Sequence, residues 1–206
     1  MMSSLYKEQY SASVRNHPDP IAYSVAITHW LRGYTSLELA VTLSVAGLLL
    51  SLATPSFLGS LQKNRITAVA HHLYHDLYLA RSTAITRGIA VTVCKSSNGS
   101  FCTTQDDWEQ GWIVFEDRDR DRVIGDRANI IGINQGRNES VSIRYSGFGA
   151  RSAIVYLPTG TSNFQTGTFT FCDSRGVAHA KALILHRSGR LRFADTRSDG
   201  SPLSCS

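Results

Sequence analysis

The sequence predicts an α+β fold in which one long N-terminal helix packs against an antiparallel, β-rich head. Over residues 59–87, apolar residues recur every three or four positions, which is the period of a helix that buries one face. After Gly88 the period changes to two, in short runs separated by Gly, Asn, Ser and Pro, which is typical of strands joined by turns. The change of period at Gly88 divides a helical part from a sheet part.

Length and composition narrow the class of protein. The 206 residues are enough for one domain with an anchor or tail and too few for a comfortable two-domain enzyme. Hydrophobic residues make up 42% and charged residues 18% of the chain, which excludes a disordered chain, a collagen and a coiled coil. The net charge of +5 permits a polyanionic partner without requiring one.

An apolar run covers residues 37–58 and contains one ionisable side chain, Glu38. Its 22 residues are enough to span a bilayer as a helix. The run passes through Pro55 into a helical segment, so we do not expect cleavage of a secretory signal peptide after it. Residues 1–32 carry one more basic than acidic side chain, which places the N-terminus in the cytoplasm and everything after residue 58 outside.

Residues 59–88 continue the same helix. Its apolar stripe consists of Ile66, Val69, Ala70, Leu73, Leu77, Ala80 and Ala84. Arg87 and Gly88 supply a basic last turn and a C-cap. We therefore expect one helix from about residue 35 to residue 87, roughly 80 Å long at 1.5 Å per residue.

The remaining residues, 89–206, form one β-rich unit without internal repeats. Short alternating runs predict seven strands, at residues 89–95, 111–116, 141–145, 153–157, 168–172, 182–186 and 190–194.

The four cysteines predict two local disulfides. Cys94 and Cys102 enclose a loop rich in Ser, Asn and Gly, and Cys172 and Cys205 bracket the last part of the head. An even number of cysteines fits an oxidising compartment. Zinc is the alternative, and the absence of Cys-x-x-Cys spacing disfavours it.

The segment Arg32-Gly33-Tyr34-Thr35-Ser36-Leu37-Glu38, followed by the apolar run, resembles the class III signal of type IV pilins and pseudopilins. The resemblance implies that a prepilin peptidase removes a leader of residues 1–33, cutting between Gly33 and Tyr34, and that Tyr34 is N-methylated. Glu38 and Pro55 then match the glutamate and the helix-kinking proline with which such subunits assemble. A plainer alternative places Glu38 at the headgroup level, where the helix dipole favours an acid.

The head resembles that of the GspH/FimT minor pseudopilins. The matching motifs are Trp108-x-x-Gly111-Trp112-x-Val114-Phe115-x-Asp117 and Ser188-Gly189-Arg190-Leu191-Arg192. The resemblance implies a lollipop-shaped subunit with a transmembrane or filament-core helix at residues 34–58 and a periplasmic head. It also implies that the chain is anchored in the inner membrane, contacts other pilins through its N-terminal helix and enters a pilus or pseudopilus.

Opposite charges gather in two segments of the head. Residues 101–126 carry eight acidic and three basic side chains, and residues 175–197 carry six basic and one acidic. The resemblance to the FimT branch implies non-sequence-specific DNA binding in natural transformation, and the residues we expect to bind are Gly189, Arg190 and Arg192 with Arg187, Lys181 and Arg197. Strand alternation would place Arg190 and Arg192 on one face, with Leu191 and Phe193 toward the core.

Two alternatives to DNA binding remain. The basic segment would merely be solubilising, or would dock on the acidic segment of another subunit. The GspH branch works instead in type II secretion, where the chain would be a pseudopilus tip subunit that does not bind DNA.

Two further clusters are interpreted as surface features. His71, His72 and His75 with Asp76 have helical spacing, and a polar helix face explains them better than a metal site. Asp117, Asp119 and Asp121 alternate as in an EF-hand loop, but Arg122 stands where that loop needs glycine. The chain lacks the catalytic and phosphate-binding motifs that we searched for, so neither an enzyme nor a cofactor or metal is expected.

Overall fold

A computed structural model describes residues 33–105, 107–126, 129–136 and 140–205, with backbone only at 52–56. Its elements in chain order are α1 (Ser36–Arg87), β1 (Val91–Lys95), η1 (Trp108–Gln110), β2 (Gly111–Glu116), β3 (Ile130–Gln135), β4 (Val141–Phe148), β5 (Ala153–Tyr156), β6 (Thr166–Asp173), η3 (Val177–His179), β7 (Lys181–Leu185) and β8 (Leu191–Ala194). The chain divides into two compact units, up to Gly47 and from Leu48 onward.

In the first unit, α1 starts at Ser36, and the hydroxyl of Thr35 caps it by accepting the Glu38 backbone N–H at 3.2 Å. Among the described residues of this unit, five large aliphatic side chains are more than half exposed: Leu37, Leu39, Val41, Leu43 and Val45. Within the described residues, no helix combines the length and the apolarity that a bilayer crossing requires. The transmembrane span expected over residues 34–58 is therefore not confirmed.

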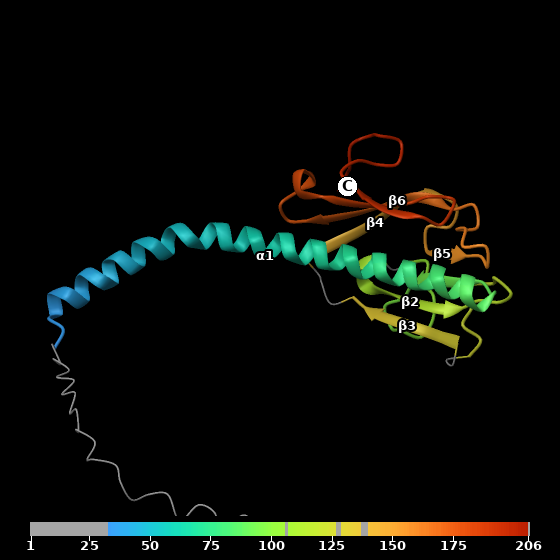
Figure 1. Ribbon diagram of the computed structural model, residues 1–206, viewed down its shortest axis with the longest axis horizontal. Helices are drawn as coiled ribbons and strands as arrows, with labels where there is room; N and C mark the ends of the chain where they lie inside the picture. The colour runs from blue at the N-terminus through green and yellow to red at the C-terminus, as the bar shows by residue number, and fades with distance from the viewer. Residues whose placement is uncertain (1–32, 106, 127–128, 137–139, 206) are drawn as a thin grey trace, which may run out of the picture. The chain divides into compact units, whose positions relative to one another are not determined.

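In the second unit, two four-stranded antiparallel sheets flank α1 (Figure 1). Sheet A has the order β3-β2-β1-β5, and sheet B has the order β4-β6-β7-β8. All seven predicted strands are present, with ends shifted by at most three residues. β3 was not predicted, because this edge strand has Gly132 at its centre and no fully buried side chain, so its sequence shows no alternation.

One core joins α1 to both sheets. The seven residues of the predicted apolar stripe, from Ile66 to Ala84, are each at most 8% exposed. They pack with Val91, Val93, Val114, Ile154 and Tyr156 of sheet A and with Val141, Ile143, Tyr145, Phe169, Phe171, Leu183 and Leu185 of sheet B. The helix ends as predicted at Arg87, followed by Gly88 with φ +65°.

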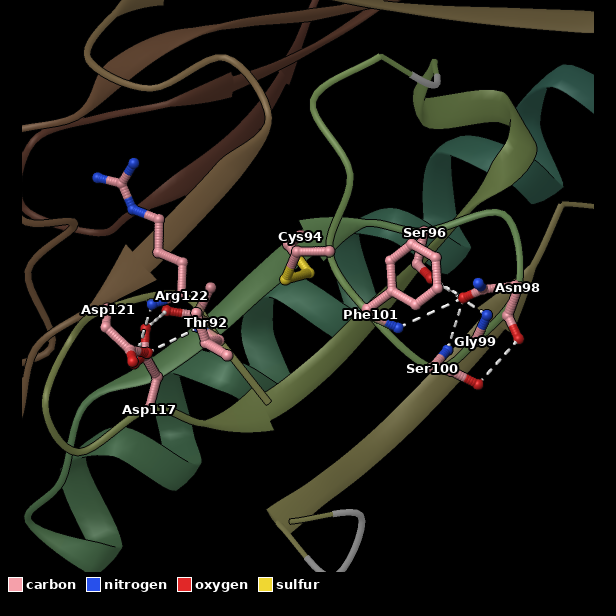
Figure 2. Close-up of a disulfide and its surroundings, with 12 residues drawn as sticks. Thr92, Cys94, Ser96, Asn98, Gly99, Ser100, Phe101, Asp117, Asp121 and Arg122 are labelled. Atoms are coloured by element: carbon pink, nitrogen blue, oxygen red, sulfur yellow. Dashed lines mark hydrogen bonds between the residues drawn. A yellow bond between two sulfur atoms is a disulfide. The ribbon is translucent and has the colours of Figure 1, made fainter. Parts of the chain in front are cut away.

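The outer face of sheet A is covered by the loop that the Cys94–Cys102 disulfide closes (Figure 2). Cys94, Ile113, Phe115 and Ala153 form a second, smaller cluster on this face, against which Cys102 packs. Within the loop, the side-chain oxygen of Asn98 accepts the backbone N–H groups of Ser100 and Phe101. The first disulfide is thus confirmed.

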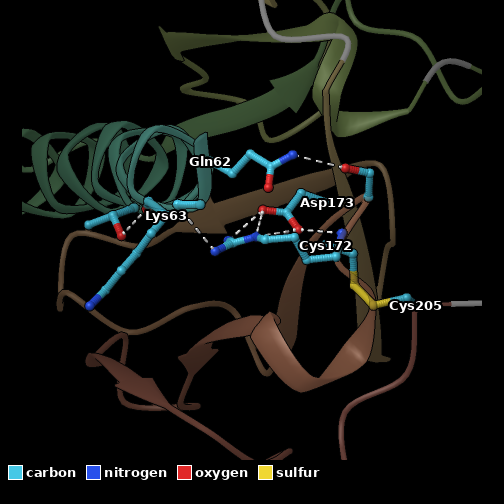
Figure 3. Close-up of polar contacts among 9 residues, drawn as sticks. Gln62, Lys63, Cys172, Asp173 and Cys205 are labelled. Carbon is cyan, nitrogen blue, oxygen red and sulfur yellow. Dashed lines mark hydrogen bonds and ion pairs between the residues drawn. A yellow bond between two sulfur atoms is a disulfide. The ribbon is translucent and has the colours of Figure 1, made fainter. Parts of the chain in front are cut away.

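The C-terminal tail covers part of the outer face of sheet B. Cys205 is bonded to Cys172 of β6, which confirms the second predicted disulfide (Figure 3). The Ser198 N–H donates to the hydroxyl of Thr168 at 3.2 Å, and Leu203 is buried. Each sheet therefore has a disulfide that holds an irregular segment against its outer face.

We expect the second disulfide to contribute more stability than the first. Cys172 and Cys205 are 33 residues apart and Cys94 and Cys102 are 8 apart, so the former restricts the unfolded chain more. Replacing both cysteines of the larger loop by serine should lower the free energy of unfolding by about 2 to 4 kcal/mol. Urea unfolding measures the loss. The paired replacement in the smaller loop is the control, and an equal or larger loss there would contradict the expectation.

Candidate nucleic-acid interface

The candidate interface is the turn between β7 and β8 and the strand that follows it. The His186 N–H donates to the Arg190 carbonyl at 2.9 Å, and the Gly189 N–H donates to the His186 carbonyl at 2.8 Å. These bonds close the hairpin and leave Arg187, Arg190 and Arg192 exposed. The turn thus gathers three guanidinium groups at one end of sheet B.

Strand register decides which way β8 presents its side chains. Arg192 is paired with Ile184, and Leu191 is paired with the core residue Leu185. Leu191 packs against the core as expected, whereas Phe193 remains 40% exposed beside the rings of His71 and Tyr74. Arg190 and Arg192 share the outer face, as alternation predicted.

On this outer face the two arginines line a groove of about 290 Å³. Ile184, His186 and Leu191 also line this groove. A groove lined by both apolar and cationic residues suits a ligand that is both anionic and partly apolar.

Gly189 shapes the backbone of the turn, and its expected part in DNA binding stays a prediction. It is buried and has φ +75°, and a Cβ at this position would overlap the Gly160 carbonyl oxygen. Arg81 of α1 connects the same two segments, because its Nε donates to the Gly160 carbonyl at 2.9 Å and its Nη2 to the Ser188 carbonyl at 3.3 Å. Gly189 therefore lets the turn dock on its neighbouring loop.

Two other expected residues lie apart from the turn. Lys181 starts β7, at the end of the hairpin opposite to Arg190, where it lines a different cavity with Lys63 and Asp195. Arg197 is half-buried in the C-terminal tail, and its Nε has no hydrogen-bond partner among the described residues. The basic residues of segment 175–197 are therefore not all close in space, and three arginines remain together at the turn.

Arg175 forms an ion pair with Asp173 of its own chain. Its guanidinium bonds both carboxylate oxygens of Asp173, with Nη2 at 2.6 Å from Oδ2 (Figure 3). This hydrogen bonding lowers the pKa of Asp173 below its ordinary value. Arg175 therefore adds little free charge to the basic surface.

The acidic segment is not one continuous face either. Asp117 is 1% exposed and accepts the Thr92 hydroxyl at 2.6 Å (Figure 2). Glu109 accepts the Ile143 N–H at 3.1 Å, and Glu116 forms ion pairs with two arginines of its own chain, Arg87 and Arg118. These carboxylates satisfy internal donors, so they offer a partner less charge than their number suggests.

The two predicted surface clusters differ in geometry. Carboxylate oxygens of Asp117, Asp119 and Asp121 lie within 4.8 Å of one another, and this trio is the one metal-compatible group within the described ranges. The histidines are separate: His71 packs on Phe193, and His72 lines another cavity. His75 lies 3.6 Å from Asp76, which also accepts the Trp112 indole N–H at 2.8 Å.

The processing and assembly residues lie at the other end of the chain. Gly33 and Tyr34 precede α1, and Tyr34 is 83% exposed. Glu38 lies in the first turn of α1. The leader before Gly33 and the side chain of Pro55 lie outside the described residues. Cleavage at Gly33 stays a prediction.

Sequence reasoning missed two exposed aromatic residues near the turn, Phe148 and Phe164. Phe148 ends β4 and is 71% exposed, and Phe164 is 61% exposed under the guanidinium of Arg187. Each is flanked by small or polar residues, so no periodic pattern marks it.

Comparisons with known proteins agree with this architecture. The profile of one family, described as type II transport protein GspH, matches residues 69–189. The type IV minor pilin FimU of Pseudomonas aeruginosa has a similar structure, with a TM-score of 0.51 and 20% identity over 69% of this chain and 96% of that one. The minor pseudopilin EpsH from the type 2 secretion system of Vibrio cholerae has a TM-score of 0.42 and 14% identity over 62% and 94%. No curated protein matches the chain.

The docking role of Gly189 can be tested by adding a methyl group. Gly189→Ala should reduce the free energy of unfolding more than Gly200→Ala, because both positions have positive φ but only Gly189 faces the Gly160 backbone. The left-handed backbone costs an alanine about 1 to 2 kcal/mol at either site. Chemical denaturation of both variants gives the comparison. Equal losses would mean that the turn does not need close contact with the loop.

Proposed function

The chain belongs to the family of type II transport protein GspH and is a minor pilin or pseudopilin, and from this premise we propose that it binds DNA without sequence preference for uptake in natural transformation. The observation that carries the proposal is the cluster of Arg187, Arg190 and Arg192 at the β7–β8 turn. None of the three joins an ion pair within the described part of the chain. All three guanidinium groups are therefore available to phosphates.

The spacing of the cluster suits a phosphate backbone. Residues two apart on a strand are separated by roughly 6.6 to 6.8 Å, which is close to two nucleotide steps of about 3.4 Å along one DNA strand. Contacts of this kind need no base readout. Lys181 and Arg197 lie apart from the turn, so its three arginines neutralise about three phosphates. This number predicts a slope of log K against log salt of about −2.7 on duplex DNA.

Assembly and anchoring belong to the same proposal. A prepilin peptidase cuts between Gly33 and Tyr34 and the new amine is methylated, after which the helix at residues 34–58 anchors the chain in the inner membrane with the head in the periplasm. The exposed apolar side chains from Leu37 to Val45 support this placement, because water disfavours such a surface. Glu38 then pairs with the amine of a neighbouring subunit.

A second candidate function is a pseudopilus tip subunit of type II secretion without DNA binding. The family to which the chain belongs is described as a type II transport protein, and this favours the second candidate. In that case the arginine cluster would contact a carboxylate-rich surface of another subunit. No enzymatic activity is proposed in either case.

Processing is tested by intact-mass analysis of the membrane form from cells with active prepilin peptidase. We expect a chain that starts at Tyr34 and carries one methyl group. Gly33→Leu should leave the precursor uncut, because the family's peptidase cuts after glycine, whereas Gly47→Leu, inside the helix, should mature as the parent does. A mature N-terminus elsewhere would contradict the proposal.

DNA binding is tested by a salt titration of a duplex of mixed sequence. Replacing Arg190 and Arg192 by glutamine should reduce the magnitude of the slope by about 1.8, because each phosphate contact contributes about 0.9. Stability should barely change, since both side chains are exposed. The control replaces two exposed arginines remote from the turn, Arg65 and Arg118, and removes the same charge.

If the double variant at the turn binds the duplex as the parent does, the DNA-binding proposal fails. The secretion subunit is then the better account. If the salt slope of the control variant falls as much as that of the turn variant, DNA binding depends on the net charge of the protein and not on the arginine cluster.

A further inference from the structure

Phe164 occupies an unusual backbone conformation that holds its ring in solvent. Both Asn163 and Phe164 have positive φ, +44° and +63°, in the region that side-chain-bearing residues rarely adopt. Such strain persists only where the surroundings determine it, and it concentrates at functional sites. The ring gains little burial in exchange, because Phe164 is 61% exposed.

The neighbours of this dipeptide fix it firmly. The buried Ser162 hydroxyl lies 2.5 Å from the Gln165 carbonyl and 3.1 Å from the His186 carbonyl. The side chain of Gln165 is also buried, accepting the Val155 N–H at 2.8 Å and donating to the Ala153 carbonyl at 2.7 Å. The loop therefore presents Phe164 rigidly.

Arg187 of the β7–β8 turn lies over this ring, with its guanidinium carbon 4.3 Å from the ring centroid. The contact is a cation–π interaction, and it orients one of the three clustered arginines. A planar guanidinium beside an exposed aromatic ring forms a surface on which flat, electron-rich ligands stack.

A second exposed ring lies at the same end of sheet B. Phe148 ends β4 opposite Thr166, the first residue of β6, and Thr166 also lines the groove that contains Arg190 and Arg192. Strand register thus brings two phenylalanines and three arginines to one end of the sheet. Exposed aromatic side chains between cations are the arrangement with which proteins bind single-stranded nucleic acids.

We propose that this end of sheet B binds single-stranded DNA, with the arginines on the phosphates and Phe148 and Phe164 stacked on bases. The inference rests on the proposed DNA binding and names its preferred substrate. A duplex keeps the faces of its bases inside the stack, so exposed phenylalanines add nothing to a purely phosphate-directed interface. An unpaired strand exposes those faces, and every base has one, so the preference does not depend on sequence.

The test compares an oligothymidylate with a duplex of equal length by fluorescence anisotropy, using the full chain in detergent at one salt concentration. The parent should bind the single strand more tightly. Replacing Phe148 and Phe164 together by leucine keeps apolar bulk and removes the aromatic rings. This change should weaken binding of the single strand at least about five-fold and leave duplex binding unchanged.

Three further variants make the result specific. Phe101→Leu is the matched control, because Phe101 is also 61% exposed but lies in the disulfide loop of sheet A, and it should bind as the parent does. Phe164→Tyr keeps an aromatic ring in the strained loop and should retain single-strand binding. Phe148→Leu alone, which leaves that loop intact, should give part of the loss even if the double variant folds poorly.

The outcomes separate the two proposals. If the parent binds the duplex with the arginine-dependent slope but the phenylalanine variants bind the single strand unchanged, only the stacking inference is wrong. The same holds if the variants lose affinity for both forms equally. If the parent binds neither form, the proposed DNA binding itself fails, and the exposed rings are better explained as contacts to another protein subunit.

Discussion

The head depends on the apolar stripe of α1. Its seven buried side chains, from Ile66 to Ala84, contact residues of both sheets, so the two sheets share one core through the helix. The stripe includes three alanines, which let the strands approach the helix closely. Truncating any large side chain of the stripe would loosen both sheets at once. Among the described elements, neither sheet packs against another buried apolar surface of this extent.

Because each sheet has its inner face on α1, its outer face has to be covered in another way. On sheet A the loop closed by Cys94–Cys102 packs over a small apolar cluster. On sheet B the tail held by Cys172–Cys205 covers the part near Thr168. The tail leaves open the end where β7 turns into β8, and it is there that the exposed arginines and phenylalanines gather.

The periodic features of this chain were predictable, and the contacts between distant segments were not. The helix, its stripe and seven strands follow from local patterns, because burial on one face imposes a period on the sequence. β3 was not predicted, because an edge strand without a fully buried side chain is not constrained by burial on one face. The separation of Lys181 from Arg190 was not predictable, since proximity in sequence does not show that a hairpin places its two ends apart. The exposure of Phe164 depends on hydrogen bonds that Ser162 makes to the β7–β8 turn and Gln165 makes to β5, which no local pattern encodes.

Arg81 links the helix to the candidate interface. It lies on α1 between the stripe residues Ala80 and Ala84, and it donates to carbonyls of both the Gly160 loop and the β7–β8 turn. The turn is therefore fixed before any ligand arrives, and binding need not order it. Weak affinity would then result from the small number of charges and not from flexibility. An interface of that kind gains most from repetition, because several rigid copies held in one assembly engage a long polyanion together, each at the high local concentration that the others create.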